Sequence, residues 1–543
     1  MNRLQTADYI VFFIYFILVS SYGYYIYKRK KAITTSSKDF FLAEGSLTWW
    51  AIGASLIASN ISAEHFIGMS GSGFALGLAI STYEWMAAAT LIIVAIFIIP
   101  VYLKNKIFTM PQFLAKRYNS TVSTIMAVIW LLVYVFVNLT SIIYLGALAI
   151  SSIAPINFEW CIAGLSIFSI IVTLGGMKVI GYTDVFQVLV LIIGGLVTTY
   201  LALTLLSEQF GFGKDILKGL SVLRKEAPTH FHMIFDKSNP HYKELPGMSV
   251  LIGGMLINNL AYWGCNQYIV QRALGADLKT ARKGILFAAF LKMLVPVIAV
   301  LPGIAMYVMH QNGMFQKEMT DAAGLIKPDH AYPTLMNLLP AGLKGVAFAA
   351  LTAAIVASLA GKANSISTIF SLDIYKKYIN QEATERKLVL TGRWAVLIAM
   401  LVGALVAPAL KSLDQAYQFI QEYAGFFSPG VLAIFLLGMF WKKTTAAAAL
   451  AGALLTVPIS TVLKFLPSWT NQAFPDYPFL DRMTITFFAI VITMVAISLI
   501  KPKPANDTHV LEVDQSMFKV TPGFIVGSFI ICGILAALYT VFW

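Results

Sequence analysis

The chain has 543 residues, of which 58% are hydrophobic and 12% are charged. Soluble globular proteins contain about 25% charged residues, so this composition excludes a single soluble domain and a disordered chain. It indicates instead that a lipid bilayer surrounds most of the protein. Lysines and arginines outnumber acidic residues by 39 to 26. Basic cytoplasmic loops of a membrane protein account for this excess, so no nucleic-acid partner is inferred.

Apolar runs predict an all-α membrane protein with about fourteen transmembrane helices, because a helix needs about 20 apolar residues to cross the bilayer. The runs lie near residues 7–27, 49–74, 77–103, 121–150, 157–176, 181–206, 248–271, 283–309, 343–374, 388–409, 413–440, 446–466, 482–500 and 521–542. The three cysteines (Cys161, Cys265 and Cys532) fall in these runs without metal-site spacing, and we interpret them as core residues.

Basic residues alternate between the predicted loops. The cluster Lys28–Lys31 follows the first apolar run, which favours an uncleaved helix with its N-terminus outside. The short loops near 74–77 and 150–156, placed outside, contain no Lys or Arg. An even number of crossings then puts both termini outside. The basic residues assigned to inside loops are Lys38, Lys104, Lys106, Lys116, Arg117, Arg272, Lys279, Arg282, Lys283, Lys376, Lys377, Arg386, Lys387, Lys442, Lys443, Lys501 and Lys503.

Two runs are too polar for regular helices that face lipid. The second run contains Ser55 to His65, including Glu64, and the seventh contains Asn258 to Gln267. Because the seventh run is five runs after the second, an odd offset, the two cross in opposite directions, as in an inverted repeat whose two halves each open with a broken helix. The alternative is a pair of Gly/Asn-rich packing interfaces. Matched positions and intramembrane charges favour transport.

Four charged residues fall within apolar runs, namely Glu64, Glu84, Lys292 and Lys362. The lysines could instead extend to the membrane surface. A pocket with both charge signs suits a neutral polyhydroxylated ligand, whose hydroxyl groups donate and accept. An anionic solute would favour an arginine fork. Amides and aromatic faces near these charges fit the same ligand, and they belong to Asn60, Asn259, Gln421, Tyr262 and Tyr417.

Four segments resemble the sodium/solute symporter family, in its sodium/glucose and galactose branch: 49–69, 174–184, 262–272 and 417–442. The resemblance extends from about residue 8 to the end and implies a leucine-transporter-type core of two inverted five-helix repeats. It implies a peripheral first helix and loop at 1–48, repeats at 49–206 and 248–440, an extracytoplasmic loop at 207–247 and peripheral helices at 441–543.

The resemblance also implies the site residues. The sugar would contact Asn60, His65, Glu84, Asn259, Lys292 and Gln421, with Tyr262 stacking on it as an inner gate. Met69, Tyr83 and Tyr417 would form an outer lid. A sodium ion would take carbonyls of Ala58, Ile61 and Ala354 and the hydroxyl of Ser358, with Asp184 on its exit route. The family implies no other cofactor.

Three departures bear on these assignments. His65 replaces a glutamine of the bacterial galactose carriers, and we interpret it as a neutral donor rather than a pH-sensitive group. Ala357 removes one of two adjacent hydroxyls, and Lys362 lies one helical turn from Ser358. Lys362 is expected either to pair with Asp184 or to weaken sodium binding by repulsion; in the extreme case coupling shifts to protons. Alternatively, it extends into an aqueous vestibule.

The sequence therefore predicts a secondary active transporter, not an enzyme, in a plasma membrane, expected to be a bacterial inner membrane. It would couple inward sodium movement to uptake of a neutral, galactose- or glucose-like hexose by alternating access. Alternatives are a proton-coupled or inositol-type polyol symporter, a carrier of carboxylated sugars, or a sugar-gated sensor or channel of the same fold. The sequence carries no signal for an oligomeric state.

Overall fold

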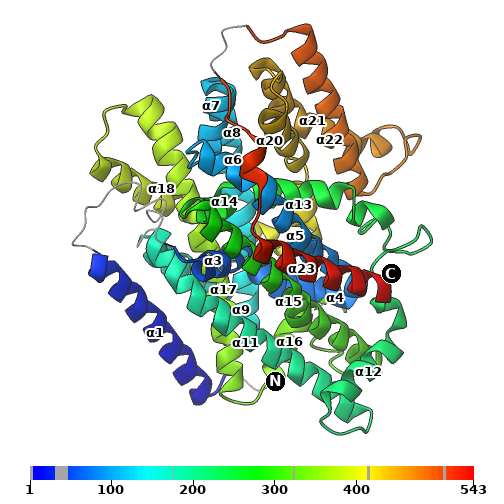
Figure 1. Ribbon diagram of the computed structural model, residues 1–543. Coiled ribbons are helices and arrows are strands. Elements are labelled where there is room, and N and C mark those ends of the chain that lie inside the picture. The colour runs from blue at the N-terminus through cyan, green and yellow to red at the C-terminus, as the bar shows by residue number, and fades with distance from the viewer. Residues whose placement is uncertain (1–3, 31–46, 175–176, 322–323, 413–415, 505–508) are drawn as a thin grey trace.

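The computed structural model describes residues 4–30, 47–174, 177–321, 324–412, 416–504 and 509–543, and these residues form helices and connecting loops (Figure 1). Within these ranges the β-structure consists of an isolated bridge between Thr320 and Ile326. The predicted all-α fold is confirmed.

The first half of the chain begins with one long helix and continues with a series of interrupted ones (Figure 1). Its α-helices are α1 (Thr6–Lys30), α3 (Trp49–Asn60), α4 (Ser70–Leu76), α5 (Thr82–Ile93), α6 (Ile99–Lys104), α7 (Met110–Arg117), α8 (Ser120–Leu132), α9 (Thr140–Ile153), α10 (Phe158–Thr173), α11 (Met177–Gln209) and α12 (Ile216–Glu226). Wider π-helical turns join several of them, namely η2 (Glu64–Met69), η4 (Val94–Ile98) and η5 (Val133–Leu139).

The second half also contains an interrupted helix near its start, and longer helices follow it. Its α-helices are α13 (Gly254–Cys265), α14 (Gln267–Leu274), α15 (Leu278–Gln311), α16 (Ala331–Leu338), α17 (Leu343–Thr368), α18 (Glu385–Val406), α19 (Ala416–Ala424), α20 (Ser428–Phe440), α21 (Ala446–Trp469), α22 (Phe479–Ile500) and α23 (Pro522–Val541). The π-helical segment η9 (Ile369–Ile379) extends α17.

Eleven helical stretches of the described residues are long and apolar enough to cross a membrane. One of them, Glu64–Lys104, is 41 residues long and turns at Gly77, whose φ of 73° lies in the left-handed region that favours glycine. The remaining predicted crossings are the 16-residue helix α10 and the two interrupted helices. The chain is therefore a multi-pass membrane protein.

Both predicted interruptions are present. Helix α3 ends at Asn60, Ile61 is extended (φ −72°, ψ 124°), and winding resumes at Glu64. The amide of Ser62 donates to Nδ1 of His65 at 3.3 Å instead of continuing the helix. The second break lies at Asn266, whose extended backbone (φ −101°, ψ 126°) separates α13 from α14. Such breaks leave carbonyls of the last turn without intrahelical partners.

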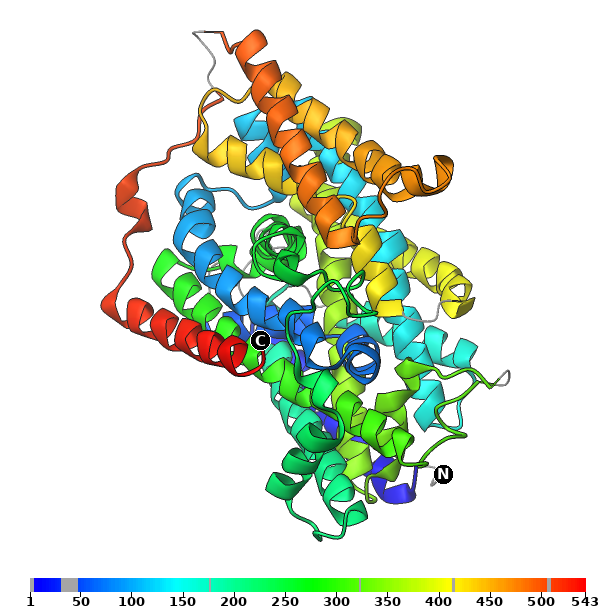
Figure 2. The ribbon, with the colours of Figure 1, turned by 90° about the vertical axis from the view of Figure 1, so that its right-hand side faces the viewer.

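Helices α15 and α17 form the centre of the molecule. Helix α17 packs against α11, α3, α9 and α14, and α15 packs against α3, α4 and α5. In the stretch from Leu343 to Ile379, 89% of the residues in the most apolar 18-residue segment are buried. The corresponding share in α1 and in α23 is 17%. Helices α21 and α22 pack together at one end of the molecule, as both views show (Figures 1 and 2). The peripheral helices leave apolar side chains exposed, as a lipid-facing surface requires.

Three arginines assigned to inside loops lie within helices and are buried. Arg117 donates from Nε to the carbonyl of Gly438 at 2.6 Å, and Arg282 to that of Ala95 at 3.0 Å. Arg272 lies within α14 and is completely buried. These side chains satisfy helix carbonyls, which a guanidinium with five donors can do inside a protein.

Candidate functional site

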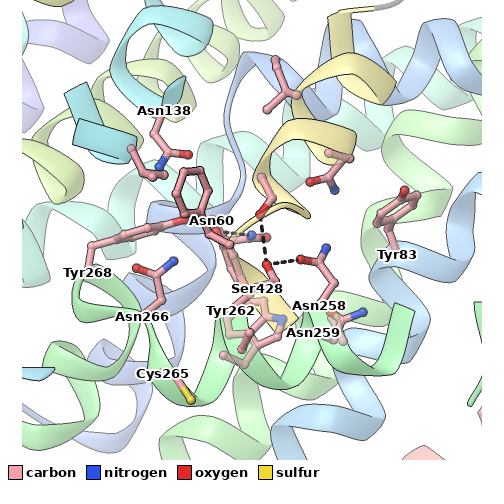
Figure 3. A pocket seen from close by; sticks show the side chains of 18 of the residues that line it. Asn60, Tyr83, Asn138, Asn258, Asn259, Tyr262, Cys265, Asn266, Tyr268 and Ser428 are labelled. Atoms are coloured by element: carbon pink, nitrogen blue, oxygen red, sulfur yellow. Dashed lines mark hydrogen bonds between the residues drawn. The ribbon is translucent and has the colours of Figure 1, made fainter. Parts of the chain in front are cut away.

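A cavity of about 130 Å³ lies between the two interrupted helices, next to α5, α15, α17 and α19 (Figure 3). The expected sugar contacts and two of the three lid residues line it: Asn60, His65, Glu84, Asn259, Lys292, Gln421, Tyr262, Tyr83 and Tyr417. Met69, the third expected lid residue, is completely buried and is not among the described residues that line the cavity.

A buried charge cluster forms one wall of the cavity. Lys292 of α15 donates to the carboxylate of Glu84 in the first turn of α5 and to the amide oxygen of Asn60. The other carboxylate oxygen of Glu84 lies 3.3 Å from Nε2 of His65. Lys292 is 1% exposed, so the alternative that it extends to the membrane surface is wrong. Its ammonium also lies 5.2 Å from the ring of Trp263.

Amides and aromatic rings complete the binding surface. Asn60 donates to the hydroxyl of Tyr262 at 2.9 Å, which holds that ring beside the break in α3 (Figure 3). Asn259 donates to the carbonyl of Met255 at 3.1 Å, so its amide oxygen stays available to a ligand. The cavity therefore combines two carboxylates (Glu64 and Glu84), two ammonium groups (Lys292 and Lys362), several amides and an aromatic face.

Two tyrosines close the cavity beside Gln421. The rings of Tyr83 and Tyr417 meet edge to face with centroids 5.5 Å apart, and Gln421 donates to the Tyr417 hydroxyl at 3.1 Å. Because Gly68 has no side chain, η2 can pack closely against Tyr417 of α19. A Cβ at position 68 would lie 2.7 Å from Cβ of Tyr417. The pair has the geometry of a hydrophobic lid.

Several polar cavity residues were not predicted as site residues. Ser428, at the start of α20, donates to the amide oxygen of Asn258 at 2.9 Å (Figure 3). Glu64 accepts from the hydroxyl of Ser141 at 2.6 Å. Asn258 and Glu64 were visible as polar residues in apolar runs. Ser428 resembled an ordinary helix-start serine, so its sequence gave no signal of a site.

The predicted sodium ligands lie where the break in α3 meets α17. Ala58, Ile61, Ala354 and Ser358 are all at most 1% exposed. The hydroxyl of Ser358 donates to the carbonyl of Ser59 at 3.1 Å, so α17 directly contacts the open end of α3. Carbonyl and hydroxyl oxygens are the hard ligands that small alkali cations take.

Lys362 does not pair with Asp184, and that expectation is wrong. Its ammonium donates to the hydroxyl of Ser358 at 2.8 Å, and the side chain is 2% exposed, so it does not extend into solvent either. Asp184 accepts instead from the hydroxyl of Ser55 at 2.5 Å, and Arg272 donates to the same hydroxyl at 3.0 Å. Ser55 thus bridges an arginine and an aspartate beneath the break.

The fold and the site define a helical secondary transporter of the leucine-transporter type. A solved structure of a Na⁺-coupled sialic acid symporter in a substrate-bound outward-open state shares this fold, with a TM-score of 0.77 and 22% identity, covering 92% of this chain and 99% of that one. The model of the Sodium:solute symporter family matches residues 40–456. The chain belongs to the sodium:solute symporter family, and it is a transporter rather than an enzyme.

Curated relatives match over nearly the whole length. A sodium/glucose cotransporter of Vibrio parahaemolyticus is 46% identical over 549 residues, which cover 100% of this chain and 99% of the relative. A sodium/myo-inositol cotransporter 2 of Sus scrofa is 33% identical and covers 88% of this chain and 72% of the relative.

Proposed function

We propose that this protein couples the inward movement of sodium to the uptake of a neutral hexose of the glucose or galactose type. The observation that supports this best is the cluster of Glu84, Lys292, Asn60 and His65 on one wall of a buried cavity. A carboxylate accepts from two hydroxyls, an ammonium donates to several oxygens, and amides do both. The similarity to a sodium/glucose cotransporter agrees with this substrate class.

The composition of the cavity disfavours an anionic substrate. No arginine lines it among the described residues, and the one carboxylate of the charge cluster is matched by one ammonium. A carboxylated sugar would add a negative charge without the bidentate partner that such groups take. Myo-inositol is a second candidate, because it presents the same hydroxyl chemistry and a sodium/myo-inositol cotransporter is a relative.

Transport would proceed by alternating access around this cavity. A sodium ion at Ala58, Ile61, Ala354 and Ser358 would join the open end of α3 to α17 and order Asn60 for the sugar. Rearrangement of Tyr83 and Tyr417 would control one side of the cavity, and that of Tyr262 the other. Each sodium charge that moves inward gains about 2.3 kcal/mol per 100 mV of membrane potential.

We place the protein in a plasma membrane, with a bacterial inner membrane as the setting, and the alternation of basic residues between loops supports both termini outside. The lipid bilayer, sodium and the sugar are then the partners of the protein, and sodium is the coupling ion rather than a resident cofactor.

Uptake into proteoliposomes tests the proposal. Purified protein is reconstituted, and accumulation of radiolabelled glucose and galactose is measured under an inward sodium gradient, a proton gradient alone and no gradient. We expect sodium-driven accumulation above the external concentration, competed by unlabelled hexose more strongly than by myo-inositol or sialic acid. Equilibration without accumulation would instead support a channel or sensor, and stronger competition by myo-inositol would support a polyol carrier.

A further inference from the structure

The hydroxyl of Ser358 already holds a cation in this structure. It accepts from the ammonium of Lys362 at 2.8 Å and donates to the carbonyl of Ser59 at 3.1 Å. Because Lys362 and Ser358 are four residues apart on α17, this contact needs no distortion of the helix. The ammonium thus binds the only side-chain oxygen among the four predicted sodium ligands.

The surroundings of the ammonium resemble those of a bound monovalent cation. Apart from Ser358, the ring of Tyr268 lies 4.8 Å from Nζ, within cation–π range. The C-terminal, negative end of α3 lies in the same region, since the Ser59 carbonyl in its last turn accepts from Ser358. No carboxylate lies within 4 Å of Nζ among the described residues. Oxygen dipoles and an aromatic face therefore stabilise this charge in place of an ion pair.

The nearby charged groups are engaged elsewhere. Glu64, which attracts the ammonium electrostatically, accepts from the hydroxyls of Ser141 at 2.6 Å and Ser62 at 3.2 Å. Arg272, which repels it, donates to Ser55, and Asp184 accepts from that same serine. The positive charge of Lys362 at Ser358 is therefore not cancelled by a direct partner.

We propose that the Lys362 ammonium is a tethered cation that competes with sodium for the Ser358 hydroxyl and the open end of α3. Sodium binds when the Lys362 ammonium turns away from Ser358 into the candidate sugar cavity, which both Lys362 and Glu64 line. Sodium affinity is thereby lowered by a residue that is not itself a sodium ligand. This inference rests on the proposed sodium coupling.

Three substitutions test the competition. Lys362→Met removes the charge and keeps most of the length, Lys362→Gln is a second neutral variant, and Lys362→Arg keeps the charge. The matched control is Lys344→Met, because Lys344 is the other lysine of α17, is also buried, and lies about 27 Å along the helix. Folding of each variant is checked by gel filtration before use.

Two readouts are measured: the half-saturating sodium concentration for hexose uptake, and binding of radioactive sodium without sugar. We expect Lys362→Met and Lys362→Gln to bind sodium about tenfold more tightly or better, because a like charge is removed from the site. Lys362→Arg and Lys344→Met should show no gain. Unchanged or weaker sodium binding in both neutral variants would overturn the inference.

The two readouts separate this inference from the proposed coupling. In one outcome, wild-type uptake does not depend on sodium, whereas the Lys362→Met variant binds sodium and its uptake becomes sodium-dependent. This result would support the tethered cation and would contradict sodium coupling of the wild type. If the wild type is sodium-driven and the neutral variants bind sodium no better than it does, the coupling stands and the competition is refuted.

Discussion

Lys292 of α15 donates to the carboxylate of Glu84 at the start of α5, and the two side chains are 1% and 4% exposed. A buried ion pair is costly to form, since both charges leave water. Here each partner has a second contact, Asn60 for the lysine and His65 for the glutamate, which offsets part of that cost. The pair presents a donor and an acceptor at a fixed position beside the cavity, before any ligand arrives.

Replacement of Lys292 by alanine is predicted to abolish sugar uptake and to destabilise the protein. Loss of one partner leaves Glu84 as an uncompensated buried charge, which costs about 3–5 kcal/mol. The double variant Lys292→Ala with Glu84→Gln removes that charge. It should recover most of the thermal stability, measured by melting temperature in detergent, without recovering uptake. Uptake with near-normal affinity in Lys292→Ala would contradict the role of the lysine.

Tyr262 is predicted to act through both its hydroxyl and its ring. Tyr262→Phe loses the hydrogen bond from Asn60, worth about 1 kcal/mol, so the half-saturating sugar concentration should rise about fivefold. Tyr262→Ala also removes the stacking face, and the loss should be clearly larger. Competition by unlabelled hexose in proteoliposomes measures both values. Equal values for the two variants would argue against stacking.

Gly68 is predicted to be required for closure of the lid. Gly68→Ala places a methyl group 2.7 Å from Cβ of Tyr417, so η2 and α19 must separate. We expect slower uptake and a lower melting temperature, since overpacking costs about 1–3 kcal/mol. Gly164→Ala is the matched control, because nothing lies within 4 Å of a Cβ at that position. Similar losses in both variants would point to a general effect of helical alanines.

Ser55 is predicted to be a major determinant of stability on the inner side of the cavity. Its hydroxyl accepts from Arg272 and donates to Asp184, so Ser55→Ala deprives two buried charged groups of a partner. The expected loss is about 2 kcal/mol or more. Ser55→Thr keeps the hydroxyl and should lose less. Thermal melting of the purified variants gives the comparison, and an unchanged melting temperature for Ser55→Ala would refute the bridging role.

The features that the sequence predicted were those with strong local signals. Polar residues within apolar runs marked the breaks at Asn60 and Asn266, and lone charges marked Glu84 and Lys292. These signals are local because a polar or charged residue within an apolar run is costly if it faces lipid, whatever its eventual partner is. The helical spacing of Ser358 and Lys362 likewise placed both on one face of α17.

Features that depend on the depth and rotation of packed helices were not predictable. The resemblance left Lys362 able to pair with Asp184, but in the structure the ammonium contacts Ser358, four residues away on α17. Arg272 follows a broken helix and resembled a loop charge, but α14 carries it back under α3. The bond between Asn258 and Ser428 joins residues 170 positions apart, so no local pattern indicates it.

The two bonds of the Ser358 hydroxyl make it sensitive to the gap between α3 and α17. If the helices separate, the bond to Ser59 breaks and the oxygen turns wholly towards whichever positive group is present. If they approach, the carbonyls of α3 gather around the same point. Cation occupancy and the distance between α3 and α17 are therefore thermodynamically linked. Because α3 belongs to the first half of the chain and α17 to the second, this one oxygen atom couples the positions of the two halves.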